Sequence, residues 1–343
     1  MKRNLQHIDE LRFLIIHLIL INHWSLNLFL LNVSYDHRIS DIFIDLTSPI
    51  LAMISGYLFF YRTRDSLRYG QKLKSRFFSL VVPYLFWAFS FFLVYILIKE
   101  LYSRIFNQTF WYAAEETISF RNILDCVIHP PLKNFWYLQN LMLIAPLSII
   151  IYYLLKNKYI YIGFVALVVC CYMFDWTSLY FSARFLPYYL VGAYFGYHEM
   201  TFPKISISKT ATWLLIPILL LVGLKSSAFK DDGLFVLPIK IFVYTLYIVT
   251  LYNIFDSNQN SYFFRYLNKY KGYSFFLFAI NVFLFSIVQR PLLSLGARNY
   301  LHNGLFLFLF LMVSLAAVLL IAFMIAAFLN RRFTRFYSTI TGR

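Results

Sequence analysis

The sequence predicts an all-α integral membrane protein, built as a bundle of about ten transmembrane helices with both termini in the cytoplasm. Of the 343 residues, 61% are hydrophobic and only 13% are charged, whereas soluble domains are about half apolar and a quarter charged. The apolar residues fall into runs of about 20, which is the length that crosses a bilayer. The Lys and Arg residues gather on alternate connections between these runs, as expected of cytoplasmic loops.

The composition excludes a soluble domain and a disordered chain, because both need far more charged and polar residues. A disulfide framework is excluded because the three cysteines are an odd number and have no C-x-x-C spacing. Ten spans with their connections use the whole length. We therefore expect a single polytopic membrane domain over residues 1–343 with no appended soluble domain.

The apolar runs place the expected spans along the chain, with errors of several residues at each end. They are 11–31, 40–61, 79–99, 136–155, 160–175, 179–198, 210–226, 234–253, 272–291 and 304–329. An even number of spans leaves both termini on the same side. The small residues Gly192 and Gly196, four positions apart in the sixth span, predict a close contact with another helix.

The distribution of cations sets the orientation. Of the 31 Lys and Arg residues, 19 lie on the side of the termini, nine lie on the other side and three lie within spans. This bias places both termini in the cytoplasm. It also accounts for the net charge of +16 without a nucleic-acid partner.

Two connections are longer than tight turns. The cytoplasmic stretch Tyr61–Phe78 carries six cations and one acid, Asp65, and the outward stretch Lys99–Phe135 is nearly neutral and rich in aromatic residues. Either stretch could bind a ligand. Alternatively, the first is an ordinary positive-inside loop and the second is an interfacial cap.

The first span carries ionisable residues, which are costly in a bilayer unless they are paired or line a wet cavity. Arg12 and His23 are 11 positions apart, so they lie within about 20° of the same helix face and about 16 Å apart along the axis. Asp9 is three residues before Arg12 and close enough to pair with it. A neutral imidazole in a cavity is a suitable general base for a hydroxyl group.

Structural interpretations of these residues stay open. Arg12 and Asp9 can form an ion pair at the membrane interface, and His23 can be a hydrogen-bonded packing residue. His17 points to another face of the helix, and its spacing from His23 is not the i, i+4 spacing of a two-histidine metal site. We therefore expect no metal site.

Five segments in the first 200 residues resemble, in order, the signature of the acyltransferase 3 family. The family consists of integral membrane enzymes that acylate surface carbohydrates and related acceptors. The segments are Arg3, Asp9, Arg12 and His23 in the first span; Ile54-Ser55-Gly56-Tyr57-Leu58; Arg76 with Pro83-Tyr84-Leu85-Phe86-Trp87; Asn134-Phe135-Trp136-Tyr137-Leu138; and Arg184 through Gly192.

The chain departs from the family pattern at two places. Ser79 stands where a second arginine often follows the one matching Arg76, which weakens a two-arginine clamp. A late family motif often ends in Tyr and His, and here those positions are Phe278 and Asn281. The late histidine is then not essential, or Asn281 supplies only a hydrogen bond.

The resemblance implies acetyl-CoA or another acyl-CoA as the donor and co-substrate. His23 would deprotonate the acceptor hydroxyl or carry the acyl group transiently, while Arg12, oriented by Asp9, would bind the donor or support developing charge. The residues expected to bind the donor near the basic stretch are Arg76, Lys74, Lys72 and Tyr84.

The acceptor would be a hydroxyl of a surface polysaccharide, an O-antigen or a lipid-linked glycan. The residues expected to contact it are Trp136, Tyr137, Arg184 and Tyr188. Aromatic rings suit stacking on a sugar face. Arg184 could also be a snorkelling arginine without a functional role.

The resemblance thus implies a multi-pass acyltransferase of a bacterial inner membrane, acting in O-acetylation of exopolysaccharide or lipopolysaccharide. Its partners are acyl-CoA, a glycan acceptor and membrane lipids. The alternative is a transporter of a polysaccharide or acyl carrier that makes and breaks no bond. A sensor or scaffold would leave the polar stripe of the first span without a purpose.

Overall fold

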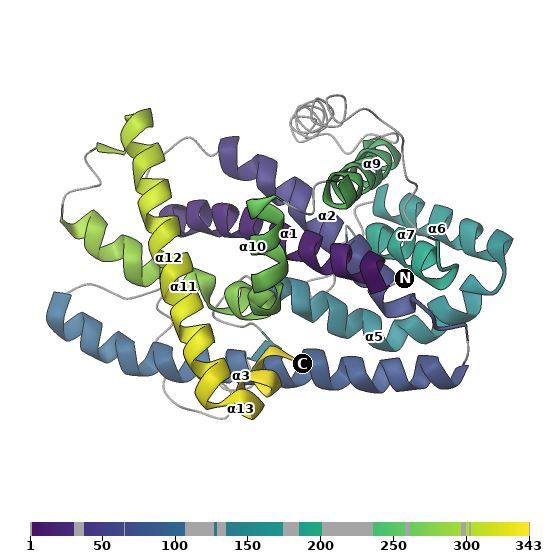
Figure 1. Cartoon of the computed structure of the whole chain (residues 1–343), viewed down its shortest axis with the longest axis horizontal. Helices are drawn as coiled ribbons and strands as arrows, with labels where there is room; N and C mark the ends of the chain where they lie inside the picture. The colour runs from purple at the N-terminus through teal and green to yellow at the C-terminus, as the bar shows by residue number, and fades with distance from the viewer. Residues whose placement is uncertain are drawn as a thin grey trace.

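The computed structural model describes residues 2–30, 38–64, 66–106, 127–128, 135–173, 185–200, 236–257, 261–295, 300–301 and 303–342. Within these ranges all regular secondary structure is helical (Figure 1). The α-helices are α1 (Lys2–Leu30), α2 (Arg38–Phe60), α3 (Ser66–Phe106), α5 (Trp136–Leu155), α6 (Lys158–Met173), α7 (Leu186–Tyr197), α9 (Val236–Ser257), α10 (Tyr262–Tyr270), α11 (Ser274–Ser294), α12 (Gly304–Arg332) and α13 (Thr334–Thr341), and the short 3-10 helix η2 (Lys271–Tyr273) joins α10 to α11.

Nine of the ten expected spans overlap helices in the described ranges, although residues 179–184 of the sixth span lie outside these ranges, and so does the whole span at 210–226. In the part of the chain that the structure describes, four helical stretches are long and apolar enough to cross a membrane: Arg68–Val94, Trp136–Leu155, Tyr262–Ser294 and Gly304–Arg332. Shorter apolar helices cover Thr47–Phe60, Lys158–Cys171 and Pro238–Ile254. The all-helical class is confirmed for the described residues.

The outer surface of α12 shows why such a helix needs lipid around it. Large apolar side chains recur along it with about half or more of their surface exposed, among them Leu305, Phe308, Val313, Leu320, Met324 and Phe328. Water would not solvate so continuous an apolar strip. The strip suits the hydrocarbon region of a bilayer.

The basic stretch after the second span differs from the expected loop. Helix α3 begins at Ser66, well before the expected start at 79, and continues for 41 residues. Leu, Arg, Gln and Lys favour helix in its first turns, and only Gly70 opposes it there. The cations from Arg68 to Arg76 are therefore held on a rigid helix.

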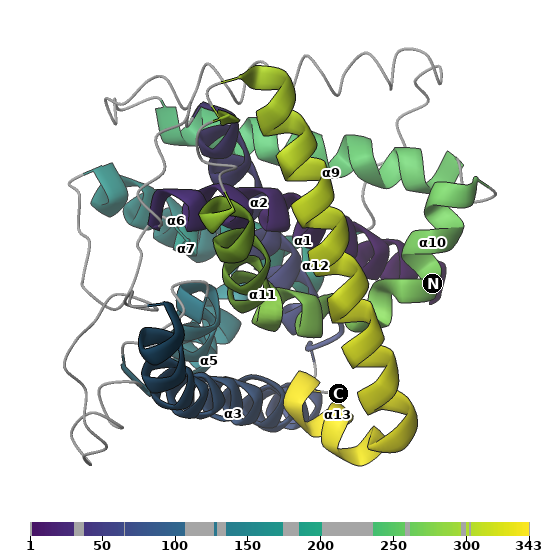
Figure 2. The ribbon, with the colours of Figure 1, turned by 90° about the vertical axis from the view of Figure 1, so that its left-hand side faces the viewer.

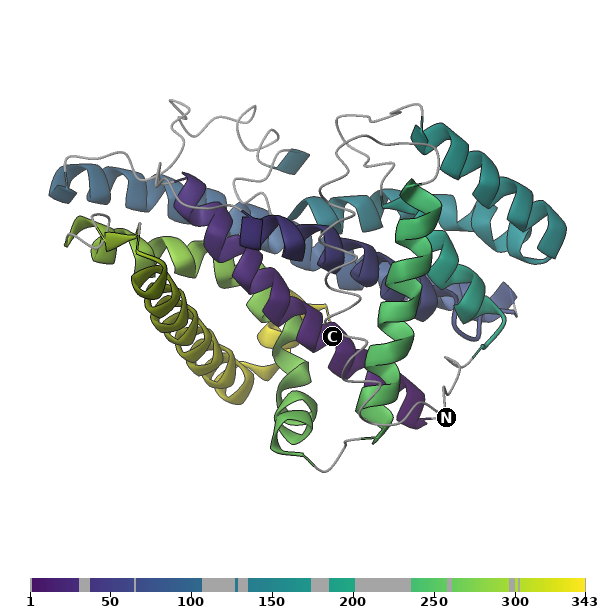
Figure 3. The ribbon, with the colours of Figure 1, turned by 90° about the horizontal axis from the view of Figure 1, so that it is seen from above.

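Helix α1 lies in the middle of the bundle, where it packs against α2, α9, α10, α11 and α12 (Figure 3). Phe13, Ile15 and Leu20 on it are completely buried. Its central position brings its polar residues next to several other helices.

Helices α2 and α7 pack backbone to backbone. A Cβ atom at Gly192 would lie 1.9 Å from the Met53 carbonyl oxygen, and one at Gly196 would lie 2.3 Å from that of Tyr57. Any side chain at these positions would separate the helices. The close contact predicted from the two glycines is confirmed.

The end of the chain folds back onto α3. Helix α13 turns away from the end of α12 and lies against α3 (Figure 2). The Trp87 Nε1–H on α3 donates to the Ile340 carbonyl oxygen at 2.9 Å. Tyr337 and Ile340 are buried in the same contact region. The last turn of the chain is thereby fixed beside the part of α3 between Ser79 and Trp87.

Candidate functional site

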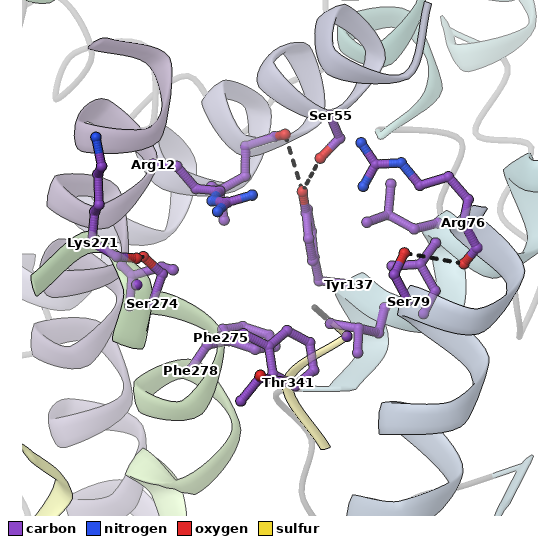
Figure 4. A pocket seen from close by; sticks show the side chains of 17 residues that line it. Arg12, Ser55, Arg76, Ser79, Tyr137, Lys271, Ser274, Phe275, Phe278 and Thr341 are labelled. Atoms are coloured by element: carbon purple, nitrogen blue, oxygen red, sulfur yellow. Dashed lines mark hydrogen bonds between the residues drawn. The ribbon is translucent and has the colours of Figure 1, made fainter. Parts of the chain in front are cut away.

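A cavity of about 180 Å³ lies where α1, α2, α3, α5 and α11 meet the last turn of the chain (Figure 4). Pockets for complete small molecules are usually about 300–1,000 Å³, so this cavity fits part of a larger ligand. Its lining residues are Arg12, Ile16, Leu51, Ser55, Arg76, Ser79, Leu80, Tyr137, Leu138, Leu141, Lys271, Gly272, Ser274, Phe275, Phe278, Thr341 and Gly342.

The charge of the lining is entirely positive. Arg12, Arg76 and Lys271 contribute cations, and no lining residue is acidic. The Lys271 ammonium points away from the other two and lies 3.9 Å from the Glu10 carboxylate. The two arginines are therefore the cations that a ligand in the cavity would meet.

Arg12 is only partly neutralised. Its Nη2 lies 3.4 Å from Asp9 Oδ1, so the predicted ion pair is present, with about 40% of each side chain exposed. Its Nε atom is buried and has no hydrogen-bond partner among the described residues. An anion in the cavity would supply that acceptor, since a buried unpaired donor is costly.

Arg76 faces the same cavity from the opposite side of Tyr137 (Figure 4). Its guanidinium makes no hydrogen bond or ion pair to any described residue. A half-buried guanidinium presents several N–H donors in a planar fork that matches carboxylate and phosphate groups. The guanidinium of Arg76 can therefore bind an anionic ligand in the cavity.

Tyr137 separates the two arginines and is held in place at its hydroxyl group. The hydroxyl donates to the Leu51 carbonyl oxygen at 3.0 Å and accepts from Ser55 Oγ at 2.6 Å. It joins the start of α5 to α2. Tyr137 is thus a rigid wall of the cavity.

His23 lies deeper along α1 and does not line the cavity. Its side chain is buried, with 6% of its surface exposed, and Nδ1 lies 2.6 Å from Asn281 Oδ1 on α11. Ser274 and Phe278 of α11 line the cavity, so both Arg12 and His23 face this helix. His17 points elsewhere, with Nε2 3.2 Å from the Tyr266 hydroxyl.

The other residues expected to bind the donor do not line the cavity. The Lys72 ammonium donates to the carbonyl oxygens of Leu58, Phe59 and Tyr61, where it caps the end of α2. Lys74 is exposed. Tyr84 is buried and accepts a hydrogen bond from Gln139 Nε2 at 2.9 Å.

The residues expected to contact the acceptor are dispersed. Trp136, at the start of α5, is 38% exposed, whereas Tyr188 is buried with its ring 5.7 Å from that of Tyr244. Arg184 lies outside the described residues. Of the three members of this group that the structure describes, only Tyr137 lines the cavity.

Several residues of the site were not singled out from the sequence. Ser55 lies within a segment that resembles a family motif, and Ser274 lies four residues before Phe278, at the Ser that begins the late family motif, so this was the available signal. Lys271, Thr341 and Gly342 carried no such signal, because only the fold brings them to Arg12. Within the described part of the chain, no group of three or more His, Cys, Asp or Glu residues could hold a metal ion.

Comparison with known proteins adds one finding. A family model described as an acyltransferase domain matches residues 5–328, nearly the whole chain. No curated protein and no solved structure shows a significant match.

Proposed function

From its membership of the acyltransferase 3 family, to which the chain belongs, we propose that this membrane acyltransferase uses acyl-CoA as donor and acylates a carbohydrate hydroxyl. Acetyl is the acyl group that we propose. The acceptor is a surface polysaccharide, an O-antigen or a lipid-linked glycan. The observation that carries the donor assignment is the cavity with two incompletely neutralised arginines, Arg12 and Arg76.

The phosphate groups of coenzyme A are the anions that suit these arginines. Charge-assisted hydrogen bonds from a guanidinium to phosphate are short and can be bidentate. The cavity is too small for the whole donor, so it would hold a phosphate-bearing part and leave the rest outside. The cation distribution supports placing this opening on the cytoplasmic side, where acyl-CoA is made.

The thioester would extend from the cavity towards His23. Ile16 lines the cavity, and His23 follows it by seven residues on α1, which is about 10 Å along the helix axis. The flexible pantetheine arm of the donor can cover such a distance between α1 and α11. Arg12 then lies at the phosphate end of the donor, 11 residues or about 16 Å along α1 from His23.

His23 would act as general base. It takes the proton of the acceptor hydroxyl while the hydroxyl oxygen attacks the thioester carbonyl, and the C–S bond breaks as the tetrahedral intermediate collapses. The imidazolium returns the proton to the leaving thiolate. An acyl-histidine intermediate, in which His23 attacks the thioester first, remains the alternative order of steps.

Trp136 is the aromatic residue that we propose for the acceptor. Its ring is partly exposed at the start of α5, immediately before the cavity residue Tyr137. An exposed indole can stack on the apolar face of a sugar.

We place the protein in a bacterial inner membrane. A transporter would have no use for the acyl chemistry of this family.

Transfer of label from radioactive acetyl-CoA to a glycan extract of the host tests the proposal. The purified protein in nanodiscs is compared with His23→Ala, and folding of both is checked by thermal unfolding. We expect the parent chain to label glycan and the folded His23→Ala variant to be inactive. Glycan binding by the parent without consumption of acetyl-CoA would instead favour the transporter.

A further inference from the structure

The contact between His23 and Asn281 determines which nitrogen of the imidazole can act as a base. Both side chains are buried, and the hydrogen bond joins Nδ1 of His23 to Oδ1 of Asn281 at 2.6 Å. A neutral imidazole has one N–H donor and one acceptor nitrogen. The orientation of the Asn281 amide decides between them.

The backbone of α11 fixes that orientation. Asn281 Nδ2 donates to the Leu277 carbonyl oxygen at 3.1 Å and to the Phe278 carbonyl oxygen at 2.8 Å. If the amide were flipped, its oxygen would lie against the carbonyl oxygens of Leu277 and Phe278. Neither of these oxygens can donate a hydrogen bond to it. The amide oxygen must therefore face His23, and an amide oxygen only accepts.

His23 Nδ1 consequently carries the proton in the neutral ring. The lone pair is then on Nε2, which makes no hydrogen bond to the described residues. Without Asn281, a histidine side chain favours the opposite tautomer, with the proton on Nε2. In that tautomer Nε2 carries a proton and donates, whereas the proposed reaction needs Nε2 to accept the proton of the hydroxyl group.

We propose that Asn281 is a positioning residue that holds His23 as the Nδ1–H tautomer and so presents Nε2 to the acceptor hydroxyl. This inference rests on the proposed function for the role of Nε2, whereas the tautomer itself does not depend on it. The hydroxyl proton moves to Nε2, and the resulting imidazolium keeps its Nδ1–H bond to Asn281. The proton then passes to the sulfur of the leaving thiolate.

The same turn of α11 connects the hydrogen bond between His23 and Asn281 to the cavity. Phe278 contributes its side chain to the cavity wall and its carbonyl oxygen to the Asn281 amide. A shift of this turn would therefore move both the wall and the base. A misplacement of about 1 Å at a reacting group can lower the rate about 100-fold.

The tautomer can be measured without any substrate. The ¹⁵N chemical shifts of labelled histidine distinguish Nδ1–H from Nε2–H, and a difference spectrum against His23→Gln isolates the His23 signals in nanodiscs. We expect Nδ1–H in the parent chain at a pH where the ring is neutral. Observation of Nε2–H in the parent would overturn the proposal without any variant.

Two substitutions extend the test. Asn281→Leu removes the hydrogen-bond acceptor with little change in side-chain volume. We expect His23 in this variant to lose its preference for the Nδ1–H tautomer. We also expect kcat to fall by about 100-fold, while KM for acetyl-CoA stays within about twofold of the parent value. Asn281→Asp in its protonated form keeps an oxygen towards His23 while its O–H donates to the Leu277 or Phe278 carbonyl oxygen, so this variant should retain Nδ1–H and recover most of the turnover. Thermal unfolding establishes that each variant is folded.

Asn140→Leu is the matched control, because Asn140 is a buried amide on α5 whose Nδ2 also donates to its own helix, at 2.8 Å to the Trp136 carbonyl oxygen. It should leave the His23 signal and kcat unchanged. Retention of Nδ1–H in Asn281→Leu would overturn the proposal, whatever the turnover. If the parent shows Nδ1–H but never transfers an acyl group, the proposed function fails while the tautomer assignment stands.

Discussion

The guanidinium groups of Arg12 and Arg76 face one cavity from two helices, on either side of Tyr137. Asp9 contacts Arg12 alone, at 3.4 Å, and Arg76 has no carboxylate partner among the described residues. One carboxylate therefore balances only one of the two cations, and an anion between them would relieve their mutual repulsion. The pair therefore defines the part of the cavity where a phosphate would bind.

Lys72→Met should destabilise the protein without weakening donor binding. The Lys72 ammonium caps α2 through three backbone carbonyl groups, and hydrogen bonds to a charged group contribute about 1.5–3 kcal/mol. We expect the free energy of unfolding to fall by about that amount and KM for acyl-CoA to stay within about twofold. Lys74→Met, at an exposed position of the same helix, should change neither quantity. A large rise in KM for Lys72→Met at unchanged stability would show that Lys72 binds the donor instead.

Asp9→Asn should affect activity less than Arg12→Gln. The ion pair is about 40% exposed, and pairs of this kind contribute about 0.2–1 kcal/mol. Loss of the carboxylate should lower kcat/KM by no more than about fivefold, whereas loss of the guanidinium should cost about tenfold or more. Steady-state kinetics on both variants measures the difference. Equal losses would mean that Asp9 itself takes part in the reaction.

Tyr137→Phe should loosen the cavity wall. The substitution removes the hydroxyl that joins Ser55 and the Leu51 carbonyl to α5. We expect the free energy of unfolding to fall by about 1 kcal/mol, measured by reversible denaturation in mixed micelles. Tyr159→Phe is the control, since Tyr159 is 83% exposed. If both variants have the stability of the parent, the hydroxyl contacts of Tyr137 do not support the wall.

Gly342→Val should displace the last turn of the chain from α3. Gly342 has φ of +68°, which disfavours a branched side chain, and a Cβ atom there would lie 2.2 Å from the Ser79 carbonyl oxygen. Because Thr341 and Gly342 line the cavity, we expect KM for acyl-CoA to rise while kcat changes less. Gly163→Val is the control, because a Cβ atom there meets nothing within 4 Å. An unchanged KM would show that this turn is not part of the donor site.

Much of the helical framework could be predicted from the sequence, because the bilayer requires long apolar runs that are visible without tertiary information. The ion pair of Asp9 with Arg12 and the close approach at Gly192 were also predictable, since both depend on spacing within one helix. The start of α3 was predicted too late. Its first turns are polar, so the apolar pattern did not reveal that the helix continues through them.

The composition of the cavity required the fold. Lys72 and Arg76 are four residues apart on α3, yet one caps α2 and the other faces the cavity. The last turn of the chain reaches Ser79 across more than 250 residues, and no local pattern encodes that contact. The partner of His23 is likewise distant in sequence, because Asn281 belongs to a helix near the other end of the chain.

The most direct test of the donor site compares two thioesters in the parent and in Arg76→Gln. Acetyl-CoA carries the nucleotide phosphates, and acetyl-pantetheine has the same thioester without them. We expect Arg76→Gln to lower kcat/KM for acetyl-CoA by about 10-fold to 100-fold and to leave that for acetyl-pantetheine within about twofold, while Lys74→Gln changes neither. Equal losses for the two thioesters, or no loss for either, would contradict the assignment of the Arg12 and Arg76 cavity to the phosphates of the donor.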